Sequence, residues 1–366
     1  MACPTRAFEL RLHSAGVCSA AGGLGATVAR MAPGAPAVGV QSVDEHDAAG
    51  EPIGVIAAGP AEWLPAARVG HMVRSAALDL SAQAGVAMDA LAKERLFIVR
   101  PESGAAQAEL GFAALQAWLD VCGAESESEQ NVIAQRASWH ADAAAALAAA
   151  RRYLAGCEGD ACALLLCAES WIGPAALQSL DADDQLRSRS SGGVVPGEAA
   201  VLLRLACSSS SSGGVALRYA AGEETQDRLD CEAPLGTLVS QATIATVGSP
   251  AEGRAPAATA MRDRHASHRV MAREEEFVRR RNWSHLPAAE PEEWIDTGIF
   301  GYLGHCMPLL QLAVLAQLDV ARWPAIGCAR SLWRHTLVCA RLSAGDVPVD
   351  TSQRPPPRDA ALGVVA

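Results

Sequence analysis

The stretch from Cys162 to Leu205 constrains the fold of this chain more than any other part of the sequence. It contains a buried strand predicted over 163–167, a turn at 169–170 and a helical segment over 174–180. A second apolar strand is predicted over 199–205, after a polar loop. This order of strand, helix and strand predicts an α/β domain organised around a sheet.

The entry to the second strand is the most informative part of that stretch. It reads Pro196-Gly197-Glu198, in which Gly197 permits a tight backbone entry and Glu198 places a carboxylate beside an apolar strand. A buried carboxylate must be paired, so we expect Glu198 to be a structural group that accepts hydrogen bonds from loop N–H groups.

Three short motifs resemble the β-ketoacyl synthase branch of the thiolase superfamily. The family carries G-G-x-[ED]-S on one strand and P-G-E-[GA]-A at the entry of a later one. This chain has Cys167-Ala168-Glu169-Ser170, without the glycines, and Pro196-Gly197-Glu198-Ala199-Ala200. The turn Gly301-Tyr302-Leu303-Gly304-His305 is similar to the family's G-H-x-x-G-A-x-G turn. The resemblance covers residues 7–343 and implies a thiolase-like layered αβαβα fold built from two related halves.

The expected domain organisation follows from this resemblance and from a serine run. Residues 208–214, five serines and two glycines, have the composition of a flexible linker, because such a segment cannot pack a core. We therefore expect an N-terminal thiolase-like half over 1–207 and a C-terminal half over 215–346. The tail 347–366, with its three consecutive prolines, is predicted to be disordered.

Hydrophobic periodicity predicts the remaining elements. The acidic segment 123–130 reads as a solvated loop, and the Arg-rich segment 262–283 reads as a surface helix with one apolar face. Helices are expected near 24–32, 70–85, 109–122 and 141–156, and the segment 296–320 is expected to be a glycine-rich turn that opens into an apolar helix. Strands are expected over 7–18, 53–57, 95–100, 131–138, 215–220, 324–331 and 335–343.

Composition excludes several classes of function. The chain has 366 residues, half of them hydrophobic, and a net charge of −11, which argues against a general nucleic-acid binder because phosphate contacts need a basic surface. No apolar run reaches the roughly 18 residues that span a bilayer, so no membrane span is expected. The first ten residues lack the pattern of a secretion signal, and the expected location is cytoplasmic.

The eleven cysteines are expected to be reduced thiols. They lie in apolar, strand-like segments, as Cys162, Cys167 and Cys339 do, which is typical of cytosolic proteins. Cysteines spaced along one strand cannot close a tetrahedral zinc site, and the pair His265 and His268 has no third ligand in view. We therefore expect no metal and no cofactor.

Condensing enzymes of the resembled family form a thioester on a cysteine at the start of a buried helix. A helix N-terminus lowers the pKa of a thiol, which favours attack by the thiolate. Matching the alanine-rich helix 141–156 to the family pattern places Trp139 or His140 at that position, and the nearest cysteines, Cys122 and Cys157, lie outside the turn. The nucleophile is therefore missing from its expected place.

The family's two histidines are also displaced or missing. The loop that should carry the first falls at 245–249, which contains no histidine, and Tyr302 stands where the second belongs. His305, three residues further on, is either the displaced histidine or a core residue. His140 is either a weak base in a vestigial pocket with Trp139, Tyr302 and His305, or a residue that fills the space of the lost cysteine. Glu169, Ser170, Gly301 and Gly304 are expected to be structural.

These observations favour a non-catalytic binding or scaffold protein. The resemblance implies pairing through the thiolase-fold dimer face, as a homodimer or a heterodimer. Degenerate proteins of this kind are similar to accessory proteins of bacterial type VI secretion, which implies a secretion effector as a partner. The alternatives are a β-ketoacyl synthase-type acyltransferase with relocated residues, or the inactive partner subunit of an active ketosynthase.

Overall fold

A computed structural model describes residues 8–32, 35, 38–47, 50–60, 63–102, 108–157, 160–183, 185–187, 192–207, 214–223, 259–263, 293–318, 325–330 and 335–341. The predicted tail, the histidine loop expected at 245–249, residues 264–283 of the predicted surface helix and all of the linker except Gly214 lie outside the described residues.

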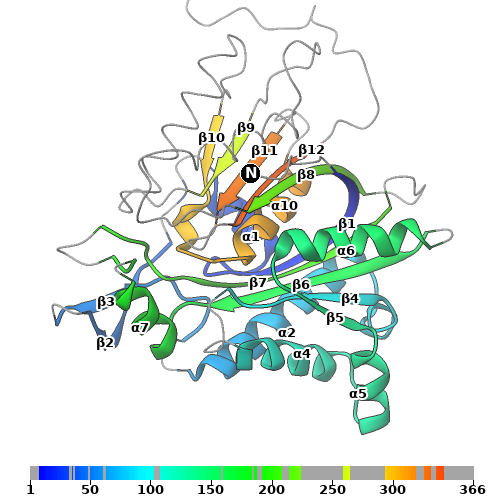
Figure 1. Cartoon of the computed structure of the whole chain (residues 1–366), viewed down its shortest axis with the longest axis horizontal. Helices are drawn as coiled ribbons and strands as arrows, with labels where there is room; N and C mark the ends of the chain where they lie inside the picture. Colours follow the sequence, from blue (N-terminus) through cyan, green and yellow to red (C-terminus); the bar gives the residue numbers. More distant parts are fainter. Residues whose placement is uncertain are drawn as a thin grey trace, which may run out of the picture.

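A ten-stranded sheet forms the centre of the molecule, in the order β10-β9-β11-β12-β8-β1-β7-β6-β4-β5 (Figure 1). Strands β4, β5 and β6 are parallel to one another, and β7 pairs antiparallel with both β6 and β1. The bounds are β1 Phe8–Cys18, β4 Arg95–Val99, β5 Ala137–His140, β6 Cys162–Ser170, β7 Glu198–Ala206, β8 Val215–Glu223, β9 Thr259–Arg262, β10 Glu293–Asp296, β11 Ala325–Arg330 and β12 His335–Arg341. A separate hairpin pairs β2 Gln41–His46 with β3 Pro52–Val55.

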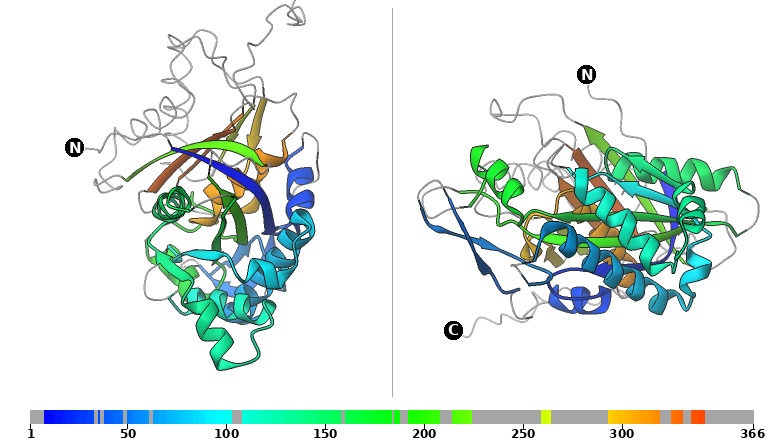
Figure 2. Two further views of the ribbon diagram at one scale, coloured as in Figure 1. Left: turned by 90° about the vertical axis from the view of Figure 1, so that its right-hand side faces the viewer. Right: turned by 90° about the horizontal axis from the view of Figure 1, so that it is seen from below.

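Helices cover both faces of the strands from the first 207 residues. α2 Pro65–Ala84 packs on β1, β7 and β6 and against α4 Ala108–Val121 on one face, and α6 Ala143–Ala155 packs on β4, β5 and β6 on the other (Figure 2). α10 Cys306–Gln317 contacts β1 and β7 as well as β11 and β12, so it lies between the two parts of the sheet. The shorter helices are α1 Leu24–Arg30, α3 Met88–Leu91, α5 Glu127–Ala134, α7 Pro174–Ala182 and the 3-10 turn Gly298–Phe300.

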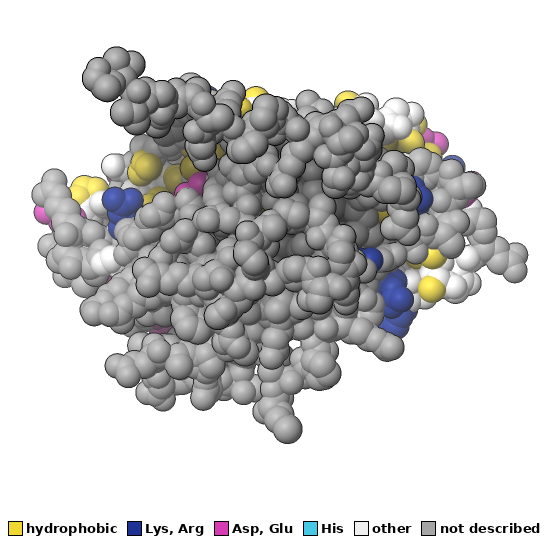
Figure 3. Space-filling model, turned by 90° about the horizontal axis from the view of Figure 1, so that it is seen from above, with side chains coloured by type: hydrophobic (Ala, Val, Ile, Leu, Met, Phe, Trp, Pro, Cys, Tyr) yellow, Lys and Arg dark blue, Asp and Glu magenta, His cyan; other side chains and the backbone are white. Residues whose placement is uncertain are grey.

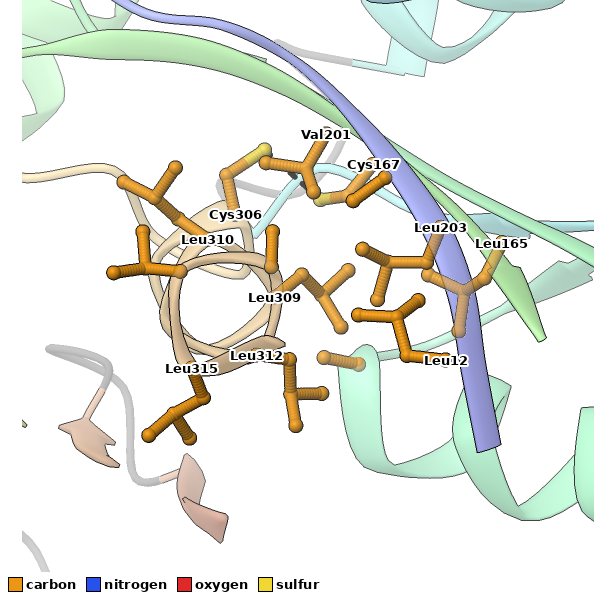
Figure 4. Close-up of a cluster of buried hydrophobic side chains, with 14 of the residues drawn as sticks. Leu12, Leu165, Cys167, Val201, Leu203, Cys306, Leu309, Leu310, Leu312 and Leu315 are labelled. Atoms are coloured by element: carbon orange, nitrogen blue, oxygen red, sulfur yellow. Dashed lines mark hydrogen bonds between the residues drawn. The ribbon is translucent and has the colours of Figure 1, made fainter. Parts of the chain in front are cut away.

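The sequence of α10 explains its central position. Residues 306–315 are all buried, because the helix is apolar on every side and a helix of that kind is stable only when it is surrounded by other elements. Figure 4 shows Leu309 and Leu312 of α10 facing Leu203 and Leu12 of the sheet. This packing joins the predicted N-terminal and C-terminal halves through one hydrophobic core.

Two predictions around β5 are wrong. Residues 127–134 form helix α5 rather than loop or strand, because Ser126 and Glu129 make a capping box: the Ser126 hydroxyl accepts from the Glu129 N–H, and the Glu129 carboxylate accepts from the Ser126 N–H. The strand expected over 131–138 is accordingly shorter and later, at Ala137–His140. The acidic composition of this segment favoured a loop prediction, although the segment contains the capping box that starts a helix.

The other predicted elements that the structure describes lie close to their expected positions, whereas β2, α3, β9 and β10 were not predicted. α2 begins five residues earlier than expected, with Pro65 in its first turn, where a proline costs no helical hydrogen bond. Arg262, expected to open a surface helix, ends β9 instead. Among the described helices, none is both long enough and apolar enough to cross a membrane.

Candidate functional site

The P-G-E motif forms a buried ion pair with a residue that the sequence did not single out. Glu198, the first residue of β7, accepts from the Arg68 Nε at 2.9 Å and from its Nη2 at 2.5 Å, and the two side chains are 0% and 2% exposed. The same carboxylate accepts from the Ala58 N–H at 2.7 Å and from the Ser170 hydroxyl at 2.9 Å. The buried Glu198 carboxylate is therefore paired with a counter-ion and accepts hydrogen bonds at both oxygens.

Gly197 lies where the strand entry meets the glycine turn before α10. Its N–H donates to the Tyr302 carbonyl at 3.1 Å, and the Tyr302 N–H donates to the Val195 carbonyl at 2.8 Å. A Cβ on Gly197 would stand 2.3 Å from the Phe300 carbonyl oxygen, and Gly301 has a φ of +77°. Close backbone approach, rather than an unusual dihedral angle, is what requires glycine at position 197.

We expect Gly197→Ala to lower the free energy of unfolding by about 1–3 kcal/mol, because the added methyl group forces the turn away from β7. Urea unfolding followed by tryptophan fluorescence measures this. The matched control is Gly25→Ala in α1, where an added Cβ meets no atom within 4 Å. Equal stability of the two variants would contradict the close approach.

A second buried network joins β6 to the start of α10. Glu169 is fully buried; its Oε2 accepts from the Trp171 indole N–H at 2.9 Å, and its Oε1 accepts from the His305 N–H at 3.0 Å. His305 Nδ1 lies 3.1 Å from the Arg100 carbonyl oxygen and 3.7 Å from Glu169 Oε1. The predicted candidates Glu169 and His305 are thus direct neighbours.

Two further residues complete this network. The Tyr302 hydroxyl donates to Glu102 at 2.5 Å, and its ring packs edge-on against Trp171 with ring centres 5.0 Å apart. Gly304, at a φ of +53°, leaves the space for both carboxylates, since a Cβ there would lie 2.0 Å from a Glu169 oxygen and 2.9 Å from a Glu102 oxygen. Tyr302, which the sequence motif matched to the family's second histidine, therefore has a hydroxyl held by a carboxylate.

The charges in this network shift two pKa values upward. Burial raises the pKa of Glu169 to about 7, partly offset by the nearby His305 and reinforced by the negative charge of Glu102. Burial disfavours the charged form of His305, but the carboxylates of Glu102 and Glu169 outweigh it and raise the pKa of that imidazole. Both shifts favour the protonated forms of the two groups relative to the same groups in water.

The start of α6, the helix that the sequence motifs matched to the family's nucleophile helix, carries a carboxylate. Asp142 is the N-cap, and its Oδ1 accepts from the Ala145 N–H at 2.7 Å. Trp139 and His140 lie before it, at the end of β5, so neither of them is the first residue of α6. Their side chains point to opposite faces of the strand: Trp139 packs on Phe112 of α4, on the face away from α6.

His140 faces the α6 side of the sheet. Its Nε2 lies 3.0 Å from the Ser138 hydroxyl, and its ring centre lies 5.5 Å from that of Phe97. Burial and the positive charge of Arg152 lower its pKa, so the imidazole is neutral at pH 7. The four predicted pocket candidates therefore do not share one site. Tyr302 and His305 belong to the Glu169 network. Trp139 lies outside it, and His140 contacts Ser138 of its own strand.

One thiol that the sequence motifs did not indicate lies at the start of a helix. Cys306 is the first residue of α10, beside His305, and it is fully buried with its Sγ 3.1 Å from Cys167 Sγ and 3.4 Å from the Ala199 carbonyl oxygen. Burial raises the pKa of both thiols. A raised pKa disfavours the thiolate, so neither thiol is a ready nucleophile.

Sequence patterns also failed to point to Asp142 and Arg68, for different reasons. Asp142 precedes an alanine run, which is a recognisable N-cap signal in the sequence. Arg68 lies 130 residues from Glu198, and no local pattern links the two. Within the described part of the chain, no group of three or more His, Cys, Asp or Glu side chains is placed to hold a metal ion.

Comparison with known proteins identifies similar solved structures, all of low sequence identity. No family model and no curated protein matches the chain. The ishigamide ketosynthase/chain length factor is similar over 92% of this chain and 99% of that chain, with 13% identity and a TM-score of 0.63. A type II PKS ketosynthase complex, AntDE:AntF, matches over 93% and 100%, with 13% identity and a TM-score of 0.62. An oxazolomycin ketosynthase domain of Streptomyces albus matches over 92% and 75%, with 14% identity and a TM-score of 0.59.

These structures match the chain over nearly its whole length, which confirms the fold class expected from the P-G-E and glycine-turn motifs. At such low identity the likeness concerns the fold and not the activity. The chain has the thiolase-like α/β fold of the ketosynthases.

Proposed function

We propose that this chain is a non-catalytic protein of the ketosynthase fold that functions by binding another protein subunit. One observation carries the proposal: the start of α6 presents the carboxylate of Asp142, committed to capping the helix, where acyl transfer needs a thiolate. A carboxylate in that position does not form the thioester on which condensation depends.

The thiols of the described residues support this reading. Burial raises the pKa values of five of them, those of Cys18, Cys122, Cys162, Cys167 and Cys306, and thereby disfavours the reactive thiolate. The position of the second family histidine is filled by Tyr302, whose hydroxyl is bonded to Glu102. The frame of the fold is kept while the groups that perform the chemistry are replaced.

Binding to a second subunit is the role that this arrangement favours. Two of the similar structures are named as a ketosynthase with a chain length factor. We therefore expect an active ketosynthase, or another chain of the same fold, as the partner. Nothing among the described residues favours a secretion effector over such a partner, so that role stays a prediction.

The test is whether the chain accepts an acyl group. We expect no mass increase when the protein is incubated with a malonyl or acetyl thioester of an acyl carrier protein and measured intact by mass spectrometry, and no release of carbon dioxide. An active ketosynthase treated in the same way is the positive control. An acyl adduct that disappears in Cys306→Ala would overturn the proposal and identify a relocated nucleophile.

A further inference from the structure

Two buried thiols meet where strand β6 faces the start of α10. Cys167 Sγ lies 3.1 Å from Cys306 Sγ, and Figure 4 shows the two residues side by side. Both side chains are 0% exposed, so neither sulfur contributes to the molecular surface, one face of which Figure 3 shows. The contact joins residues 139 positions apart, one from each of the two predicted halves.

The fold around the two sulfur atoms holds them together. Glu169 lies two residues after Cys167 and therefore on the same face of β6. Its Oε1 accepts from the N–H of His305, the residue before Cys306. Cys306 Sγ also lies 3.4 Å from the Ala199 carbonyl oxygen of β7. A disulfide bond is about 2.05 Å long, so the two sulfur atoms need to approach by only about 1 Å to form one.

We propose that Cys167 and Cys306 form a disulfide when the chain folds in the presence of a small disulfide oxidant such as oxidised glutathione, and that this bond fastens α10 to β6. The thiolate of one cysteine attacks a sulfur of the oxidant, whose S–S bond breaks and releases one thiolate. The second cysteine then attacks the mixed disulfide, forms the new S–S bond and releases the other thiolate. The two released thiolates take up the two cysteine protons, so the chain loses two electrons and the oxidant gains them.

Burial determines when this reaction takes place. In the folded chain, burial raises the pKa of both thiols, and a molecule the size of glutathione reaches a fully buried sulfur only if the core opens. The bond therefore forms before the core closes and is afterwards protected from reductants. A chain that folds under reducing conditions keeps both thiols. The folded protein thus retains the redox state of the medium in which it folded.

The test is to refold the reduced, urea-unfolded full chain in a mixture of oxidised and reduced glutathione. After the remaining thiols are alkylated, peptide mapping by mass spectrometry should find Cys167 linked to Cys306 in most molecules. The link restricts the unfolded chain, so the urea midpoint should rise by roughly 1 M relative to the reduced protein. The same mixture added to protein already folded in the reduced state should form the link at least roughly tenfold more slowly.

Cys306→Ala should abolish both the link and the shift of the midpoint. The matched control is Cys122→Ala, which removes a partly buried thiol after α4 and should keep both. The proposal is overturned if the refolded wild type carries Cys167 and Cys306 as alkylated thiols, if either is linked mainly to other cysteines, or if the folded protein forms the link as fast as the refolding chain. These results come from the wild type alone, so they hold even if Cys306→Ala does not fold.

Discussion

Arg68→Ala is expected to destabilise the protein by about 3–5 kcal/mol, because it leaves the Glu198 carboxylate buried without its counter-ion. Both side chains of the pair are almost fully buried, so solvent cannot take the place of the lost guanidinium. The loss also removes the Nη1 hydrogen bond to the Pro60 carbonyl, which joins the loop before α2 to the strand entry. Denaturant unfolding of the variant and the wild type gives the difference.

The matched control is Lys93→Ala. Lys93 pairs with Asp89 at 3.9 Å on the surface of the molecule, and its removal should cost about 0.5 kcal/mol or less. A second variant, Arg68→Ala/Glu198→Gln, should recover part of the lost stability, because no unpaired charge remains inside. An Arg68→Ala protein within about 1 kcal/mol of the wild type would mean that Glu198 is not held in the way described here.

The second large effect is a dependence of stability on pH that originates at Glu169. The folded state raises the pKa of this carboxyl from 4.5 to about 7, so it binds a proton more tightly than the unfolded chain does. Its contribution to stability is therefore present below pH 4.5 and is lost as the pH rises to about 7. The raised pKa of His305 acts in the same direction, with stability lost as the pH rises through its folded-state pKa.

The measurement is the difference between the wild type and Glu169→Gln, since other carboxylates contribute to the total pH dependence. We expect the variant to gain roughly 3 kcal/mol relative to the wild type between pH of about 4.5 and about 8. Glu127→Gln, on the exposed surface of α5, should show no such trend. A constant difference between Glu169→Gln and the wild type across this range would contradict a raised pKa at Glu169.

The sequence predicted the fold class correctly because its strongest patterns are those that any tertiary structure must satisfy. The run 163–167 is apolar throughout and 199–205 is apolar except for Arg204; the two form neighbouring central strands, and α10 is apolar on every side and lies in the core. The N-terminus of α5 was also encoded, in Ser126 and Glu129, but the surrounding charges were given more weight. Because α5 was not predicted, the predicted β5 began several residues before its observed start.

What the sequence by itself determined is the main apolar strands and helices and the absence of a cysteine in the turn before α6, since local periodicity depends only on nearby residues. The partnerships of buried charge were decided by the tertiary structure alone. Arg68 meets Glu198, and Glu102 and Glu169 meet Tyr302 and His305, across 130 residues or more. No local signal specifies them, because a buried carboxylate requires a partner but the sequence does not state which segment the sheet will bring to it.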